Sequence, residues 1–216
     1  MIKQINADLQ ESKEQLERAY MESIETLRFT VEAKDAYTRG HSDRVSAYAV
    51  LIGEVLGLSD EDIKTLRIGG LFHDIGKIGV PDSILLKPGK LTDDEYSEIK
   101  NHPTIGAHIL SNASLFSDML PIVKHHHERF DGRGYPSQLV GEDIPYLARI
   151  TAIADTFDAM TSRRPYRDAL VMQSVKDEFV RCSGSQFDPA LIPVFMDILE
   201  NQHDKILEIQ DKFPSR

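Results

Sequence analysis

The sequence predicts an all-α protein, a bundle of about seven to nine helices with a long N-terminal helix. Apolar residues recur at three- and four-residue spacing, and no sustained alternation of apolar and polar residues appears. The stretches 79–91 and 131–146 are rich in Pro and Gly and are predicted to be loops. With 216 residues, 41% of them hydrophobic, the chain can build one well-packed domain but not two large ones.

The N-terminal helix is predicted over about the first thirty residues. Its apolar stripe consists of Ile2, Ile5, Leu9, Leu16, Tyr20, Ile24, Leu27 and Val31. Up to residue 18 the stripe is thin and is interrupted near Ser12. Two interpretations are open: an amphipathic helix that packs on its own domain, or a signalling helix that pairs with a second chain and connects to an upstream sensor or receiver domain.

Further helices are indicated by apolar faces and by capping residues. One face is formed by Val45, Tyr48, Ala49 and Ile52. Gly57 is suited to end that helix, and Ser59 before three acidic residues is suited to begin the next. Thr92 and Glu95 have the spacing of a capping box, so a helix is expected to begin there.

Composition argues against several classes of function. The formal net charge is −10, whereas a domain that binds a nucleic-acid polymer normally presents a basic face. No apolar run approaches the roughly 18–20 residues of a membrane helix, so no membrane insertion is expected. Cys182 is the single cysteine, which excludes an intramolecular disulfide and agrees with a cytoplasmic location.

Histidines and aspartates gather in short segments. His73 and Asp74 end an apolar helix, where a charged Asp is costly unless a cation compensates it. Asp155 and Asp158 lie three residues apart in another apolar helix and therefore on one face. For these two alone, helix capping or a buried salt bridge with an Arg is slightly favoured. Together with the His-Asp pair they favour a metal site, because imidazole and carboxylate are metal ligands.

Several motifs occur in a characteristic order. They are Tyr37-Thr-Arg-Gly-His41, His73-Asp-Ile-Gly-Lys77, Asn101-His-Pro103, His126-His-Glu-Arg129, Asp131-Gly-Arg-Gly-Tyr-Pro136, Ala154-Asp-Thr-Phe-Asp-Ala-Met-Thr161 and Arg164-Pro-Tyr-Arg167. With these motifs the chain resembles the HD-GYP family of metal-dependent phosphodiesterases. The resemblance implies an HD-domain catalytic bundle over residues 20–203 and does not extend beyond it. The flanking segments are expected to be a signalling helix over 1–19 and a C-terminal tail over 204–216.

The resemblance also implies a set of metal ligands. They are His41, His73, Asp74, His102, His126, His127 and Asp155, with Asp74 as a catalytic bridge between two ions. Some members carry a Glu where Tyr37 stands and bind a third ion, so two ions are expected here. Phenol is a poor ligand unless it is deprotonated. Mixed His and carboxylate ligation favours iron or manganese.

Substrate-binding residues are implied in the same way. Lys77 corresponds to a catalytic lysine near the substrate phosphate, and Asp131 and Tyr135 belong to the loop that lines the substrate cleft. Arg164 and Arg167 correspond to basic residues that face the substrate. Asp158 is expected to orient its neighbours rather than to bind metal.

The resemblance implies that cyclic di-GMP is hydrolysed to linear pGpG by attack of a metal-bridging hydroxide, with further hydrolysis to GMP left open. One alternative is another substrate, such as cyclic GMP-AMP or pGpG itself. Another is a signalling module that binds a nucleotide without turnover, although every ligand position is filled. The thin N-terminal stripe further predicts a homodimer formed through the first helix.

Overall fold

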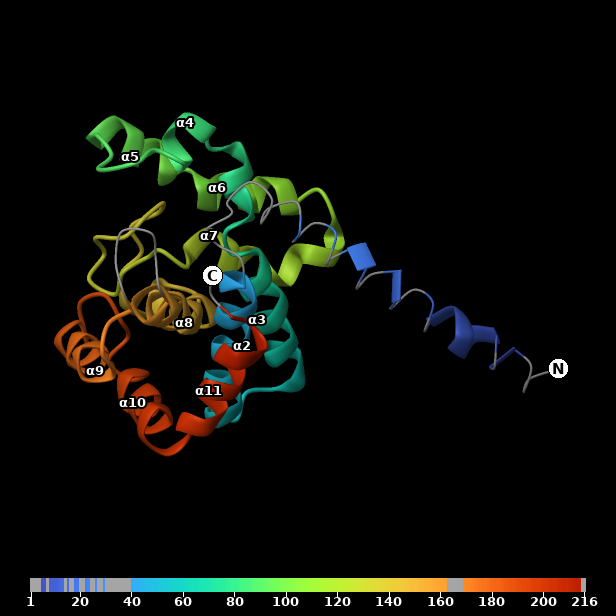
Figure 1. The fold of residues 1–216 in the computed structure, drawn as a ribbon. Helices are drawn as coiled ribbons and strands as arrows, with labels where there is room; N and C mark the ends of the chain where they lie inside the picture. The colour runs from blue at the N-terminus through green and yellow to red at the C-terminus, as the bar shows by residue number, and fades with distance from the viewer. Residues whose placement is uncertain are drawn as a thin grey trace.

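The computed structural model describes residues 40–162 and 169–214, together with separate residues between 5 and 29 (Figure 1). In the ranges 40–162 and 169–214 the chain forms ten α-helices and three 3-10 helices. These ranges contain no strand, only two isolated β-bridges, Asp131 with Val140 and Ser183 with Phe187. The predicted all-α class is therefore confirmed.

The helices follow one another in this order. The α-helices are α2 (His41–Val55), α3 (Asp60–Phe72), α4 (Asp82–Leu85), α5 (Asp93–Ile99), α6 (His102–Leu110), α7 (Leu120–His125), α8 (Tyr146–Thr161), α9 (Met172–Arg181), α10 (Ile192–Asn201) and α11 (His203–Lys212). The 3-10 helices are η2 (Ile75–Gly79), η3 (Ser114–Met119) and η4 (Gly141–Asp143).

Helices form in two segments that were not expected to be helical. The four-residue α4 lies inside the predicted loop 79–91, where Pro81 immediately precedes its first turn, a position that tolerates proline. α11 lies in the predicted tail 204–216, and its Ile206 is buried in the main core. These two helices help to explain why the described ranges contain more α-helices than the seven to nine that were predicted. The division of the chain into domains stays a prediction.

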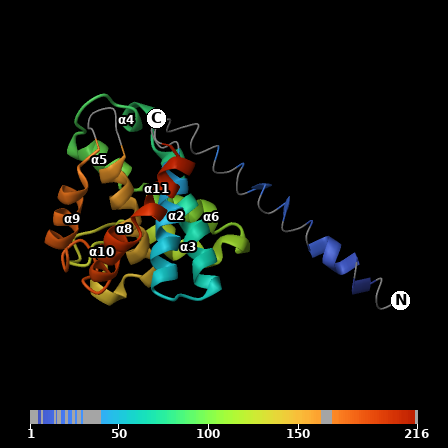
Figure 2. The ribbon, with the colours of Figure 1, turned by 60° about the horizontal axis from the view of Figure 1, so that its bottom comes forward.

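The helices surround α2 and α8. α2 packs against α3 and α8, and α11 packs against α2. α4 and α5 lie together at one end of the molecule, above α6 in Figure 1, and Figure 2 shows the same grouping from another side. Predicted caps are confirmed here: Ser59 Oγ accepts from the Asp62 backbone N–H at the start of α3, and Thr92 and Glu95 form a capping box at the start of α5.

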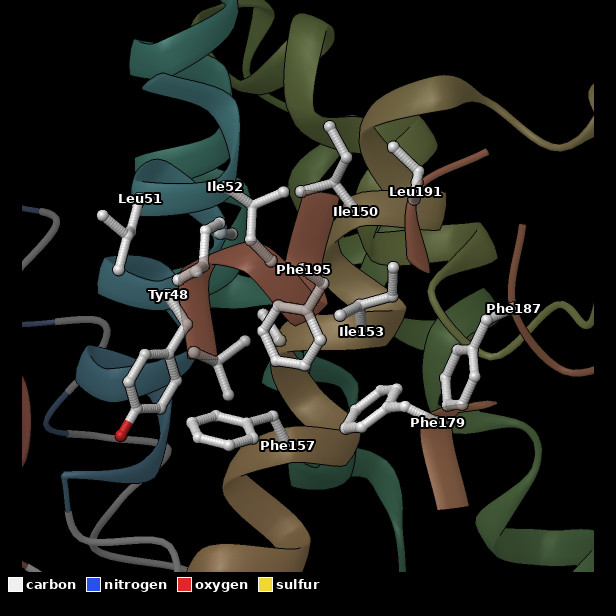
Figure 3. Packing of buried hydrophobic residues seen from close by; sticks show 14 of the residues in the cluster. Tyr48, Leu51, Ile52, Ile150, Ile153, Phe157, Phe179, Phe187, Leu191 and Phe195 are labelled. Carbon is white, nitrogen blue, oxygen red and sulfur yellow. The ribbon is translucent and has the colours of Figure 1, made fainter. Parts of the chain in front are cut away.

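A row of aromatic rings in edge and tilted contact runs through the main core, among buried aliphatic side chains (Figure 3). Tyr48 of α2 meets Phe157 of α8 at 4.9 Å between ring centroids, and Phe157 meets Phe195 of α10 at 5.3 Å. Phe179 of α9 continues the row to Phe195 at 4.8 Å. Burial of each side chain of this kind contributes about 1.5–3 kcal/mol. The row thus fixes α2 and α8 relative to each other, and both helices carry candidate ligands.

A second, smaller core fixes the other candidate ligands. It consists of Ile68, Phe72, Ile75, Leu110, Phe116, Met119 and Val123, all of them buried. These residues belong to α3, η2, α6, η3 and α7. Because Asp74 lies between α3 and η2, packing of this core sets the position of the His-Asp pair against α6 and α7.

The described residues before Gly40 are helical and exposed, and they extend away from the body in both views (Figures 1 and 2). Exposed fractions are 56% for Ile5, 68% for Leu9 and 57% for Phe29. The other stripe residues, namely Ile2, Leu16, Tyr20, Ile24, Leu27 and Val31, lie outside the described residues, as does Tyr37. Pairing through this helix stays a prediction. Among the described helices, none combines the length and the apolar character that crossing a membrane requires.

Candidate metal centre

Helix ends bring the candidate ligands together. His41 begins α2, His73 follows α3, His102 begins α6, and His126 follows α7. All seven residues implied by the resemblance fall into two groups that could each hold an ion. One group is Asp74, His102, His126 and His127, and the other is His41, His73 and Asp155. In each group the ligand atoms lie within 4.8 Å of one another.

Asp74 faces both groups. Its Oδ1 lies 3.2 Å from His102 Nε2, which belongs to the first group. Its Oδ2 lies 3.3 Å from His73 Nε2 and 3.7 Å from His41 Nε2, which belong to the second. One carboxylate thus presents one oxygen to each group, an arrangement that suits a bridging ligand.

Three of the histidines are oriented by backbone carbonyls in the last turns of helices. His73 Nδ1 donates to Gly70 O at 2.7 Å, in the last turn of α3. His102 Nδ1 donates to Ile99 O at 2.7 Å, and His126 Nδ1 donates to Val123 O at 3.0 Å. Such carbonyls have no partner within the helix and are available as acceptors. A neutral ring with its hydrogen on Nδ1 presents the lone pair of Nε2, the atom that binds a metal.

The Nε2 atoms fit a divalent cation. His73 Nε2 is buried and has no hydrogen-bond partner among the described residues. His102 Nε2 and His126 Nε2 lie 3.4 Å apart. With hydrogen on each Nδ1, these two nitrogens are both acceptors, so they cannot satisfy each other. Buried polar atoms normally have a partner, and a cation would satisfy all three.

His41 is oriented by Asp158 instead of a carbonyl. Its Nδ1 donates to Asp158 Oδ2 at 2.7 Å, and its Nε2 lies 3.3 Å from Asp155 Oδ1. Arg44 donates to both Asp158 oxygens, from Nε at 2.5 Å and from Nη2 at 3.0 Å. Asp158 is therefore both the orienting residue and one half of a buried ion pair.

Arg44 links this arrangement to the end of the chain. Its Nη1 donates to the Phe213 backbone carbonyl at 2.7 Å, just after α11. Sequence reasoning did not single out Arg44. The available signal was its position three residues after His41, on the same face of the helix.

Burial and opposite charges shift the ionisation of the cluster in different directions. Burial alone would lower the pKa of His41, but Asp155 and Asp158 outweigh it and raise that pKa to about 9. Burial lowers the pKa of His127 to about 4, despite the opposing effect of Asp155. The pKa of Asp155 is lowered, because His41 and His73 outweigh the opposing effect of burial. Neutral His127 and ionised Asp155 are the forms that bind metal.

The glycine-rich loop covers the cluster with Tyr135. The Tyr135 ring centroid lies 4.8 Å from that of His127 and 6.5 Å from that of His102. The buried carboxylate of Glu128 holds the loop, accepting from Ser137 N at 2.7 Å and from Leu139 N at 3.2 Å. This role of Glu128 could not be predicted from its motif, because its partners are backbone groups of a loop.

Two glycines allow close approach of backbone at the site. A Cβ at Gly134 would overlap the backbone of Glu128 and Arg129, so the loop could not lie against this segment. A Cβ at Gly76 would overlap the carbonyl oxygen of His102, so η2 could not pack on α6. Both glycines therefore bring groups of the site together.

The predicted substrate-binding residues differ in their surroundings. Lys77 Nζ lies 2.7 Å from Asp74 Oδ2, at the cluster. Asp131 accepts from Arg129 Nη2 at 2.7 Å and from Arg133 N at 3.1 Å, contacts that hold the loop. Arg164 and Arg167 lie outside the described residues.

The family model described as an HD domain matches residues 25–191. The chain belongs to the HD domain family. This confirms the family-level prediction from the motifs. The HD domain accounts for the helical fold, and proteins of this family are metal-dependent phosphohydrolases, in agreement with the His and Asp cluster.

Curated relatives extend the comparison. A cyclic di-GMP phosphodiesterase response regulator of Xanthomonas campestris is 41% identical over 86% of this chain and 50% of its own length. A 3'3'-cGAMP-specific phosphodiesterase of Vibrio cholerae is 34% identical over 96% of this chain and 38% of its own. The chain thus spans half or less of the length of these relatives.

A solved structure supports the fold. The crystal structure of a cyclic GMP-AMP specific phosphodiesterase of V. cholerae has a TM-score of 0.66 to this chain at 20% identity. The likeness covers 88% of this chain and 52% of that one. At this identity it supports the helical HD-domain fold alone.

Proposed function

We propose that this HD domain is a metal-dependent phosphodiesterase that hydrolyses cyclic di-GMP to linear pGpG. The observation that carries the proposal is the convergence of buried Nε2 atoms from His73, His102 and His126 with the carboxylate of Asp74. The name of the 41% identical relative supports the choice of substrate. The geometry thus supports a site that binds cations, and the relative's name supports a phosphodiester as its substrate.

The proposed ligands form two groups with Asp74 between them. His102, His126 and His127 would hold one ion, and His41, His73 and Asp155 the other. Iron or manganese is proposed, because a mixture of imidazole and carboxylate suits these metals. When bound, a pair of divalent ions supplies Lewis acidity toward a phosphoryl oxygen and makes water a stronger nucleophile.

The protein's own residues would position the substrate. We propose that Lys77, now 2.7 Å from Asp74 Oδ2, donates to an oxygen of the scissile phosphate when substrate is bound. Tyr135, beside His127, would form one wall of the substrate cleft and exclude water. Arg164 and Arg167 keep the proposed role of neutralising phosphate charge, as such fixed donors do in phosphoryl transfer.

A second substrate is cyclic GMP-AMP. It is favoured by one observation: a relative named as specific for 3'3'-cGAMP aligns over 96% of this chain at 34% identity. We place cyclic di-GMP first, because the relative with that activity in its name matches at 41% identity over 86% of this chain, whereas a 3'3'-cGAMP-specific relative with 42% identity matches over only 67%.

The test is turnover of the purified chain, loaded with iron or manganese, on cyclic di-GMP, cyclic GMP-AMP and pGpG, with products separated by chromatography. We expect cyclic di-GMP to give pGpG. His73→Ala should abolish turnover, because it removes a buried ligand, whereas His108→Ala, at an exposed histidine of α6, should retain it. Metal-loaded protein that cleaves none of the three nucleotides would contradict the proposal.

We also propose an upstream domain and a homodimer formed through the first helix. The name of one relative includes response regulator, and this chain covers half of that protein. The exposed Ile5 and Leu9 side chains agree with a partner for this helix. The lone cysteine is the basis for proposing a cytoplasmic location.

A further inference from the structure

Lys100 is held between two aromatic rings at the edge of the candidate site. It lies at the end of α5, two residues before His102. Its Nζ is 4.6 Å from the centroid of the Tyr96 ring and 5.9 Å from the centroid of the Tyr135 ring. Both distances are within the range of a cation–π contact.

Tyr135 connects Lys100 to the candidate ligands. Its ring contacts His127 at 4.8 Å between centroids. The ammonium group thus lies one aromatic ring away from a proposed metal ligand. Lys100 is only partly buried, and Tyr96 is 47% exposed, so solvent and solutes can reach this edge.

Lys100 differs from the other lysines near the site in its partners. Lys77 lies 2.7 Å from an oxygen of Asp74, and Lys87 lies 2.6 Å from one of Glu95. Among the described residues no carboxylate lies within ion-pair distance of Lys100. An ammonium group in contact with aromatic rings is not neutralised by a carboxylate, so its charge stays available for an anion. This positive charge stands out in a chain whose formal net charge is −10.

We propose that Lys100, positioned by Tyr96 and Tyr135, binds the phosphate of the cyclic dinucleotide that is not being hydrolysed. This rests on the proposed function. A cyclic dinucleotide carries two phosphodiesters in one macrocycle, so while one is at the ligand cluster the other must lie beside it. Lys100 supplies a cation there and makes the site selective for substrates with two phosphates.

The test compares a substrate with two phosphodiesters and a substrate with one. Lys100→Met should lower kcat/KM for cyclic di-GMP by about tenfold or more, through KM, because charge-assisted hydrogen bonds are lost. The loss for bis(p-nitrophenyl) phosphate, which has a single phosphodiester, should be at least several-fold smaller. Lys100→Arg should recover part of the loss. Lys90→Met removes the same charge from an exposed lysine of the neighbouring loop and should retain wild-type kinetics.

Equal losses on both substrates would overturn the proposal, because Lys100 would then act through the metal cluster or the fold. No loss on cyclic di-GMP would overturn it too. Equilibrium binding of cyclic di-GMP to the metal-loaded protein separates this from the proposed function. If the wild-type protein binds cyclic di-GMP without hydrolysing it, the proposed activity fails. Weaker binding by Lys100→Met would then still support the proposed role of Lys100 in binding the second phosphate. If wild type neither binds nor hydrolyses it, both proposals fail.

Discussion

His41 and Asp158 are 117 residues apart in the sequence, yet His41 Nδ1 lies 2.7 Å from Asp158 Oδ2. Both groups are buried, and Arg44 binds the same carboxylate. The bond fixes the ring so that its Nε2 faces Asp155 at 3.3 Å. A residue that touches no candidate ion thus determines where one proposed ligand points.

Asp158→Asn should weaken metal affinity about 10–100-fold, because the orienting partner of a ligand is lost. Asp188→Asn is the matched control. Asp188 is also buried and also pairs with an arginine, Arg149, and it is absent from both candidate ligand groups. Both variants should unfold at lower temperature, but only the first should lose metal affinity in a competition titration. Similar losses of affinity in the two would show that stability, not orientation, is the cause.

Arg44→Ala should reduce the free energy of unfolding of the ion-free protein by about 3–5 kcal/mol, since it removes one partner of a buried ion pair and leaves the Asp158 carboxylate with His41 alone. Arg44→Lys should cost less, because the charge remains while the forked contact with Asp158 and the bond to the Phe213 carbonyl are impaired. Urea unfolding followed by circular dichroism measures both. An alanine variant as stable as wild type would mean that the ion pair between Arg44 and Asp158 contributes nothing to the free energy of unfolding.

Metal binding should release a proton from His41. In the ion-free protein its pKa is raised to about 9, so the ring is protonated at neutral pH, and an ion must displace that proton. Affinity should therefore increase with pH up to about 9. The sign for stability is opposite: the contribution of the protonated ring is complete below its unfolded pKa of 6.5 and is lost as pH rises through about 9.

Calorimetry of metal binding in buffers with different ionisation enthalpies measures this release. Near pH 7.5 we expect about one proton per chain from His41. His127 should add none, because its pKa is lowered to about 4. Metal binding without net proton release at this pH would contradict the conclusion that His41 is protonated in the ion-free protein.

Glu128→Gln should impair substrate binding without loss of metal. The carboxylate accepts two backbone N–H groups of the glycine-rich loop, and an amide can accept through only one oxygen. The loop that carries Tyr135 should loosen, so KM for cyclic di-GMP should rise several-fold while metal content stays at the wild-type level. Glu142→Gln, at an exposed position of η4, is the control. Unchanged KM in Glu128→Gln would exclude this role.

The parts of the site that could be predicted from sequence are local. His73 and Asp74 stand together at the end of an apolar helix, and such a pair is visible without any tertiary contact. The capping box at Thr92 was likewise predicted, because its donors and acceptors lie within one turn. Motifs in a fixed order identified the remaining candidate ligands.

The parts that could not be predicted depend on distant contacts. The bond from Arg44 to the Phe213 carbonyl spans 169 residues and involves a backbone atom, which has no sequence signature. α11 could not be predicted from its sparse apolar residues, because it packs partly on α2, which is far away in the sequence. The contact of Lys100 with Tyr135 depends in the same way on the path of a loop.

The most direct test of the account is the rate of cyclic di-GMP hydrolysis as a function of metal content. Ion-free protein is titrated with iron or manganese, and bound metal and pGpG are measured in the same samples. We predict no turnover without metal and a rate that rises to a plateau at two ions per chain, one for each ligand group around Asp74. Full turnover by the ion-free protein, or no turnover with both ions bound, would contradict it.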